Sequence, residues 1–152
     1  MKKIVITGAL GYIGSELCKL YSGFSWKYDI VAIDNRFISE RVNELKRRKI
    51  KFIQADILDI ESIKPYIEKA EVIHHLAGIT DVAYVKKESD KVKDDLTVKV
   101  AIEGTANVLK SMNADATIVF PSTHVVFEGL KEQKKNLDEN EKTNTFLAYS
   151  TS

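Results

Sequence analysis

Five short apolar runs, each followed by a longer segment with helical periodicity, constrain the fold of this chain more than any other feature. The runs are rich in β-branched residues, as expected of strands that are buried on both faces. In the segments between them, apolar residues recur with the spacing of a helix that packs on one side. The predicted strands are residues 3–7, 29–34, 51–55, 71–77 and 116–122, and the predicted helices are residues 12–24, 38–48, 60–68 and 83–112.

This alternation of strands and helices predicts an α/β fold with a doubly wound parallel sheet. Right-handed crossovers place the connecting helices on both faces of such a sheet. The expected strand order is 3-2-1-4-5, with a ligand crevice at the carboxyl ends of the first and fourth strands. We also expect Asp59 to cap the third helix and Pro65 to lie near the end of that helix or to kink it.

Composition and charge narrow the classes of function. The 152 residues contain 44% hydrophobic and 30% charged residues and no linker-like segment, which predicts one domain over residues 1–152. The formal net charge is +1, so no overall field favours nucleic acid or an anionic membrane, and neither is expected as a partner. No apolar stretch reaches the ~20 residues of a membrane span. The single Cys18 lies in an apolar helical segment, which predicts a buried thiol in a reduced, cytoplasmic protein.

A glycine-rich turn, TGALGYIG at residues 7–14, joins the first strand directly to the first helix. Gly8 permits a tight turn, Gly11 lets a pyrophosphate approach the backbone, and Gly14 lets the helix pack closely on the strand. The N–H groups around Tyr12 and Ile13, at the positive end of the helix, can then hold the diphosphate. Glycines alone would fit an ordinary strand-to-helix turn, but strand, turn and helix together favour a phosphate-binding loop.

A second test of dinucleotide binding is an acidic residue about 20 residues after the loop, at the end of the second strand, where it accepts hydrogen bonds from the adenosine ribose. Asp34 is at that place, and Asn35 follows it. A carboxylate there repels a 2′-phosphate, which favours NAD over NADP, while the nearby Arg36 keeps NADP open. Without the glycine loop, this aspartate would be interpreted as a solvated turn residue.

With these motifs the chain resembles the extended short-chain dehydrogenase/reductase family, which includes NAD-dependent nucleotide-sugar epimerases and dehydratases. Its TGxxGxxG spacing is that family's form of the loop. ADILD at residues 55–59 is similar to the family segment that contacts the adenine ring, which assigns Asp56 and Ile57 to that contact. HLAG at residues 75–78 is similar to the strand end beside the nicotinamide ribose. The resemblance places Leu76, Ala77 and Gly78 there.

The two adjacent histidines, His74 and His75, are interpreted as strand residues. Neighbouring strand residues point to opposite faces, and no Cys or acidic cluster accompanies the pair, so no metal site is predicted.

The resemblance also implies catalytic residues. Residues 119–129 resemble the family's fifth-strand signature and place Thr123 on the catalytic Ser/Thr; residues 146–152 resemble the start of its Y-x-x-x-K helix and place Tyr149 on the catalytic tyrosine. Tyr149 would take the hydroxyl proton as a hydride leaves a sugar carbinol carbon for the nicotinamide, and Thr123 would hold the same oxygen.

Two departures from the family pattern qualify the expected activity. The family's catalytic lysine would fall directly after Ser152, and Ala101 stands where the family usually has an asparagine. We therefore expect the NAD-binding portion of a nucleotide-sugar epimerase or dehydratase, inactive alone and without the C-terminal substrate-binding region. The alternatives are a non-catalytic dinucleotide-sensing or interaction module and a sterol- or flavonoid-type reductase of the same family.

The resemblance leaves the oligomeric state open. In the family, the helical region around residues 92–112 often packs against a second subunit, which would make this protein a homodimer. Otherwise the apolar residues of that region face the chain's own sheet; these are Val92, Leu96, Val100 and Val108.

Overall fold

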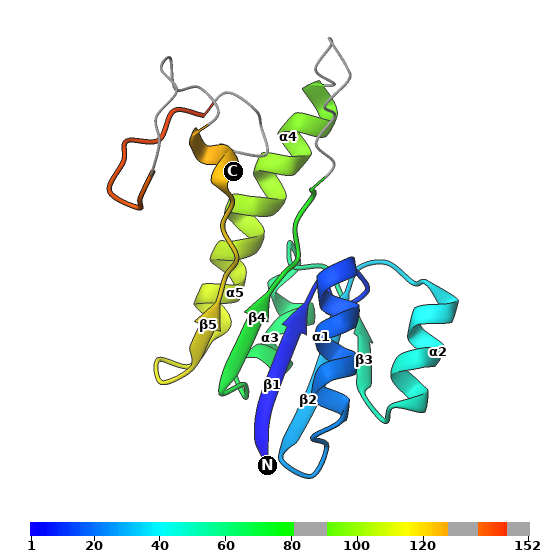
Figure 1. Cartoon of the computed structure of the whole chain (residues 1–152). Helices are drawn as coiled ribbons and strands as arrows, with labels where there is room; N and C mark the ends of the chain where they lie inside the picture. Colours follow the sequence, from blue (N-terminus) through cyan, green and yellow to red (C-terminus); the bar gives the residue numbers. More distant parts are fainter. Residues whose placement is uncertain (81–90, 128–136, 146–152) are drawn as a thin grey trace.

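The computed structural model describes residues 1–80, 91–127 and 137–145. A five-stranded sheet with the order β3-β2-β1-β4-β5 forms its centre, and every pairing is parallel (Figure 1), which confirms the predicted fold and strand order. The strands are β1 (Lys2–Thr7), β2 (Tyr28–Asp34), β3 (Lys51–Gln54), β4 (Val72–His75) and β5 (Thr117–Val119). Because all strands run the same way, the sheet has one carboxyl edge, where the strands end, and one amino edge, where they begin.

The helices follow the strands as the periodicity predicts. They are α1 (Tyr12–Ser22), α2 (Ser39–Arg47), α3 (Ile60–Ile67), α4 (Lys91–Lys99), a π-helical turn (Val100–Gly104), α5 (Thr105–Ser111) and a short 3-10 turn (His124–Phe127). The helix predicted over residues 83–112 is present from Lys91 onward, and residues 83–90 of that prediction lie outside the described residues. Asp59 caps α3 as predicted by accepting a hydrogen bond from the Glu61 N–H, and Pro65 lies inside α3 near its end.

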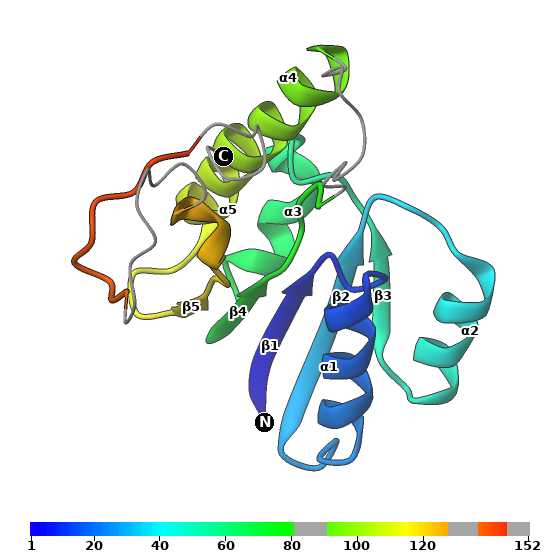
Figure 2. The same cartoon turned by 45° about the horizontal axis from the view of Figure 1, so that its top comes forward.

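Two hydrophobic cores hold the layers together, one on each face of the sheet (Figures 1 and 2). Alternate residues of β1 enter different cores: Ile4 and Ile6 pack with α1 and α2, whereas Val5 packs with α3 and α5. Each such buried side chain stabilises the fold by about 2 kcal/mol. Cys18 is buried in the first core as predicted, and burial raises the pKa of its thiol to about 12, so it stays protonated and unreactive.

The apolar residues of the long helical region from α4 to α5 were expected to face either a second subunit or the chain's own sheet, and the structure shows a different result for each half of the region. Val108 is fully buried and Val100 packs on the second core, so this half faces the chain's own sheet. Val92 and Leu96 are 79% and 46% exposed, so the apolar side chains of the other half are not covered by the sheet. Within the described residues, no helix is long and apolar enough to cross a membrane, and no group of His, Cys, Asp and Glu side chains could hold a metal ion.

A strained residue ends α2. Lys49 has φ 57°, where an L side chain costs about 1 kcal/mol, and the Ile50 N–H donates to the Leu45 carbonyl across the helix end at 2.9 Å. We expect Lys49→Gly to raise the free energy of unfolding by about 1 kcal/mol because glycine adopts this conformation without strain. Lys46→Gly, inside α2, is the control and should lower stability by up to about 1 kcal/mol. Urea denaturation measures both, and a Lys49→Gly variant no more stable than Lys46→Gly would contradict the strain argument.

Candidate functional site

The glycine-rich turn lies directly against the end of β4. Gly8 has φ +67°, and a Cβ added there would lie 2.6 Å from the carbonyl carbon of Leu76 and 2.7 Å from the Ala77 nitrogen. The Ala9 N–H donates to the Ile33 carbonyl at 3.1 Å and the Gly11 N–H to the Gly8 carbonyl at 2.9 Å. The turn is therefore held between β2 and β4, at the carboxyl edge where a ligand crevice is expected.

The first turn of α1 packs on this loop and faces outward. A Cβ at Gly14 would lie 2.3 Å from the Gly8 oxygen, so only glycine permits the observed contact between helix and loop. In the described part of the chain, no side chain caps α1 at Gly11, and Tyr12 and Ile13 are 83% and 61% exposed. The N–H groups of the first turn are thus not used by a capping side chain, and the helix dipole makes this position favourable for an anion.

Asp34, at the end of β2, forms a hydrogen bond with the backbone of the glycine-rich turn. The residue is 5% exposed, and its carboxylate accepts hydrogen bonds from the Leu10 N–H at 2.9 Å and the Arg36 N–H at 3.0 Å. The Arg36 guanidinium adds bonds of 3.0 and 3.2 Å, and the hydrogen bond to Asp34 raises the pKa of Arg36. These four donors use the roughly four acceptor positions of a carboxylate. A ribose hydroxyl could therefore reach Asp34 only by replacing the guanidinium, whose side chain is 56% exposed.

The predicted adenine-contacting residues meet beside Asp34. The Asn35 side chain donates to the Asp56 carboxylate at 3.2 Å, and Asp56 also accepts from the Leu58 N–H at 2.9 Å. Asn107 of α5 was not among the predicted site residues; its side chain donates to the carbonyls of Ile57 and Leu58 at 3.0 and 3.2 Å. Its sequence neighbours in α5 are a mixture of polar and apolar residues, so no local pattern indicates this contact.

A buried histidine connects β1, β4 and α5. The Thr7 hydroxyl accepts from the Ala77 N–H at 3.3 Å and lies 2.7 Å from His75 Nδ1, while His75 Nε2 lies 3.0 Å from the Thr105 hydroxyl. Burial lowers the pKa of His75 to about 4, so the ring is neutral. The pattern fits an Nε2–H tautomer that accepts from Thr7 and donates to Thr105. The ring also stacks on Phe120 after β5, with centroids 5.5 Å apart.

The two histidines of β4 serve opposite faces, as predicted. His74 Nε2 lies 2.8 Å from the hydroxyl of Tyr21 on α1, whereas His75 points to α5. Both are the last residues of the strand, which confirms their interpretation as strand residues.

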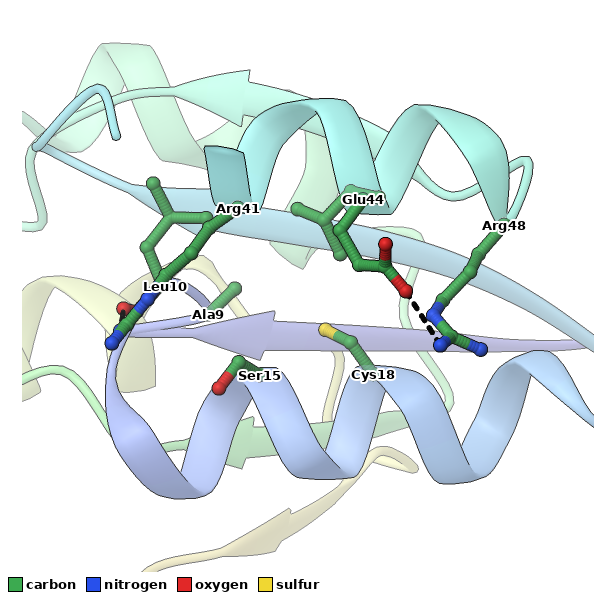
Figure 3. A pocket seen from close by; sticks show the side chains of 8 residues that line it. Ala9, Leu10, Ser15, Cys18, Arg41, Glu44 and Arg48 are labelled. Carbon is green, nitrogen blue, oxygen red and sulfur yellow. Dashed lines mark hydrogen bonds and ion pairs between the residues drawn. The ribbon is translucent and has the colours of Figure 1, made fainter. Parts of the chain in front are cut away.

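A cavity of about 50 Å³ lies behind the loop, between α1 and α2 (Figure 3). Arg41 donates to the Leu10 carbonyl at one end, and the Glu44–Arg48 ion pair lies at the other. This volume holds water molecules but no cofactor. The lining residues are Ala9, Leu10, Ser15, Cys18, Arg41, Glu44, Leu45 and Arg48. Both backbone groups of Leu10 are therefore bound: its carbonyl accepts from Arg41, and its N–H donates to Asp34.

The predicted catalytic pair is only half described. Thr123 follows β5, is half-buried, and its hydroxyl oxygen accepts from the Val125 N–H at 3.3 Å. Tyr149 lies outside the described residues. Ala101 falls in the π-helical turn, four residues before Thr105.

The family model of the 3-beta hydroxysteroid dehydrogenase/isomerase family matches residues 5–151. The chain belongs to this family. As a member of the 3-beta hydroxysteroid dehydrogenase/isomerase family, it carries the Rossmann fold of the extended short-chain dehydrogenases/reductases, as the motifs predicted.

Individual relatives of this family member include epimerases. UDP-glucose 4-epimerase of Mus musculus is 32% identical over 145 residues, which cover 84% of this chain and 39% of the mouse protein. The solved UDP-glucose-4-epimerase of Stenotrophomonas maltophila, with bound NAD and formylated UDP-arabinopyranose, has a TM-score of 0.78 at 22% identity. A monomeric L-threonine 3-dehydrogenase from a metagenome has a TM-score of 0.75 at 29% identity. The matches cover 99% and 97% of this chain, but only 45% and 44% of those structures.

Proposed function

We propose that residues 1–152 form the dinucleotide-binding domain of an NAD-dependent nucleotide-sugar epimerase or dehydratase. The observation that carries this proposal is the uncapped first turn of α1 above Gly11, with the buried carboxylate of Asp34 beside it. The mouse epimerase and the NAD-bound epimerase structure support it. The family model is named after steroid dehydrogenases, so our proposal of a nucleotide-sugar substrate is based on the epimerase relatives. None of the relatives described above is a sensing or interaction module.

The chain's own residues suit an extended dinucleotide. We assign the pyrophosphate to the loop, the adenosine ribose to Asp34, the adenine to the Asn35–Asp56 pair, and the nicotinamide ribose to the segment after β4. Bound NAD would supply a reversible hydride acceptor. The proposed cofactor-binding residues are Gly8, Gly11, Tyr12, Ile13, Gly14, Asp34, Asn35, Asp56, Ile57, Leu76, Ala77 and Gly78.

Charge at the ribose position favours NAD over NADP. When Arg36 moves away to admit a ribose, the exposed carboxylate of Asp34 repels a 2′-phosphate. If Arg36 instead kept its contact, its guanidinium would attract that phosphate, and NADP would bind.

For the reaction, we assign proton transfer to Tyr149 and positioning of the substrate oxygen to Thr123. A tyrosine with an ordinary pKa of ~10 is a poor base at neutral pH, and in the family a lysine one helical turn later lowers that pKa. That lysine would follow Ser152. We therefore expect residues 1–152, tested alone, to bind NAD without turnover.

Calorimetric titration with NAD and NADP tests the proposal, alongside Gly11→Val and the matched variant Gly23→Val at the far end of α1. The valine at residue 11 should block the pyrophosphate and weaken NAD binding at least tenfold, about 1.4 kcal/mol. Gly23→Val should bind NAD as the unmodified protein does, because a Cβ there meets only the Leu20 carbonyl at 3.4 Å. Failure of the unmodified protein to bind either cofactor, or equal binding by both variants, would refute the site.

A further inference from the structure

Positive charge is concentrated in three segments of this nearly neutral chain. Residues 1–3, 20–28 and 46–51 contain eight of the 23 Lys and Arg residues and none of the 22 Asp and Glu residues. The rest of the chain therefore has 15 basic and 22 acidic residues. The net charge of +1 is therefore the sum of a positive region, the three segments, and a negative region, the rest of the chain.

The three segments lie side by side at the amino edge of the sheet, away from the proposed cofactor site. The Lys2 N–H donates to the Lys27 carbonyl at 3.0 Å, which joins the first segment to the second. Arg48 donates to the Ser22 hydroxyl at 3.2 Å, which joins the third segment to the second. Figure 1 shows all three at the lower end of the molecule, around the N-terminus and the turns that follow α1 and α2. We call this region the basic end.

Most of this charge faces solvent without a carboxylate partner among the described residues. Within the part of the chain that the structure describes, Arg47 and Arg48 are the basic-end residues that form ion pairs, both with Glu44. Asp29 and Glu71 border the basic end; Glu71 accepts from the Lys3 N–H and lines a hollow at this edge together with Glu68 and Asp115. The exposed lysines are Lys2, Lys27, Lys46, Lys49 and Lys51.

The dipole of α2 favours cations in its last turn. It accounts for Lys46 and Arg47 but not for Lys2 and Lys27, which lie on other elements.

Three large apolar side chains project from the same place. Leu20 is 63% exposed, Phe24 46% and Trp26 75%. Backbone hydrogen bonds from Phe24 to Tyr21 and from Lys27 to Phe24, at 2.9 and 2.8 Å, hold them on a compact turn. Exposed apolar groups rimmed by lysines are typical of surfaces that enter the interfacial region of a bilayer. Tryptophan in particular prefers the headgroup level.

We propose that the basic end binds an anionic membrane surface, with Leu20, Phe24 and Trp26 in the headgroup region and the surrounding lysines on the lipid phosphates and carboxylates. Nucleic acid is the other polyanion that lysines and aromatic rings attract, but Leu20 has no ring on which a base could stack. A membrane accommodates all three apolar side chains and attracts the lysines near them. Bound this way, the protein keeps its carboxyl edge directed away from the lipid.

Trp26 is the chain's only tryptophan, so its fluorescence reports on this surface alone. We would titrate the protein with vesicles of equal parts phosphatidylcholine and phosphatidylserine, with vesicles of phosphatidylcholine alone, and with a single-stranded oligonucleotide. The expected result is a blue shift with the anionic vesicles, and quenching by brominated lipid. A response to neutral vesicles of the same strength, no response to lipid, or a response only to the oligonucleotide would overturn the proposal.

Variants test the charge and apolar contributions separately. Lys27→Gln and Lys46→Gln combined should lower partition to anionic vesicles by about fivefold per lysine. The control makes the same charge change at two exposed residues away from the basic end, Lys99→Gln in α4 and Lys142→Gln near the end of the described chain. It should leave partition within about twofold of the unmodified protein, because neither lysine belongs to the basic end. Leu20→Ser, which keeps every charge, should also weaken binding, and equal losses in the two lysine pairs would contradict the proposed surface.

Discussion

Gly8→Ala is expected to lower the free energy of unfolding by at least about 3 kcal/mol and the Tm by roughly 10 °C. A positive φ near +67° already costs an alanine about 1 kcal/mol. The added Cβ would also lie 2.6 Å from the Leu76 carbonyl carbon and oxygen. Both are backbone atoms of a strand end, so no side chain can rotate to relieve the overlap. Either the loop or the end of β4 must move.

The control for this prediction is Gly23→Ala, which carries the same change where φ is −66° and the nearest contact is 3.4 Å. Its stability should stay within about 0.5 kcal/mol of the unmodified protein. Thermal and urea unfolding measure both variants. A Gly8→Ala protein within about 1 kcal/mol of the control would show that the loop does not depend on this contact with β4.

Acidification from pH 6.5 to 4 should remove about 3 kcal/mol of stability through His75 alone. Burial lowers the pKa of His75 from 6.5 to about 4. The unfolded chain therefore binds a proton on this ring in a pH range where the folded protein keeps it neutral. The contribution is fully present above pH 6.5 and is lost as the pH falls to about 4. His74, whose pKa burial also lowers, adds to the effect with the same sign.

His75→Gln isolates this contribution, because its amide can still reach Thr105 but cannot take up a proton in this range. Urea denaturation at a series of pH values should show a shallower loss of stability in the variant, whatever its stability at pH 8. His74→Gln serves as the comparison, and it should change the slope less because His74 is only half-buried. Parallel pH profiles for the unmodified protein and His75→Gln would disprove the assignment.

The sheet order and the loop could be predicted because local patterns determine them. Apolar runs with β-branched residues indicate the strands, and crossover handedness restricts their order. The spacing of Gly8, Gly11 and Gly14 between a predicted strand and a predicted helix indicates the loop. The strands β4 and β5 are shorter than predicted, Val72–His75 and Thr117–Val119, because apolar residues continue past the last ladder hydrogen bonds.

Contacts between distant segments could not be predicted. Thr7 and His75 are 68 residues apart, and Asn107 and Ile57 are 50 apart, so neither pair leaves a local pattern. The contact of Arg36 with Asp34 is close in sequence, but a guanidinium at this position can bind either the carboxylate or a 2′-phosphate, and the sequence does not distinguish the two. The basic end could not be predicted for a different reason. The net charge is a sum over the whole chain and does not show that three separate basic segments lie side by side in the fold.

The contact of Gly8 with Leu76 and Ala77 has a consequence for how the crevice can vary. The loop proposed for the pyrophosphate and the strand end proposed for the nicotinamide ribose share one backbone-to-backbone surface with no side chain between them. Evolution or design can therefore exchange side chains around either half, as Asp34 and Arg36 illustrate, but cannot reposition one half without the other. Divergence of ligand preference in such a domain is confined to the rim of the crevice, while its floor stays constant.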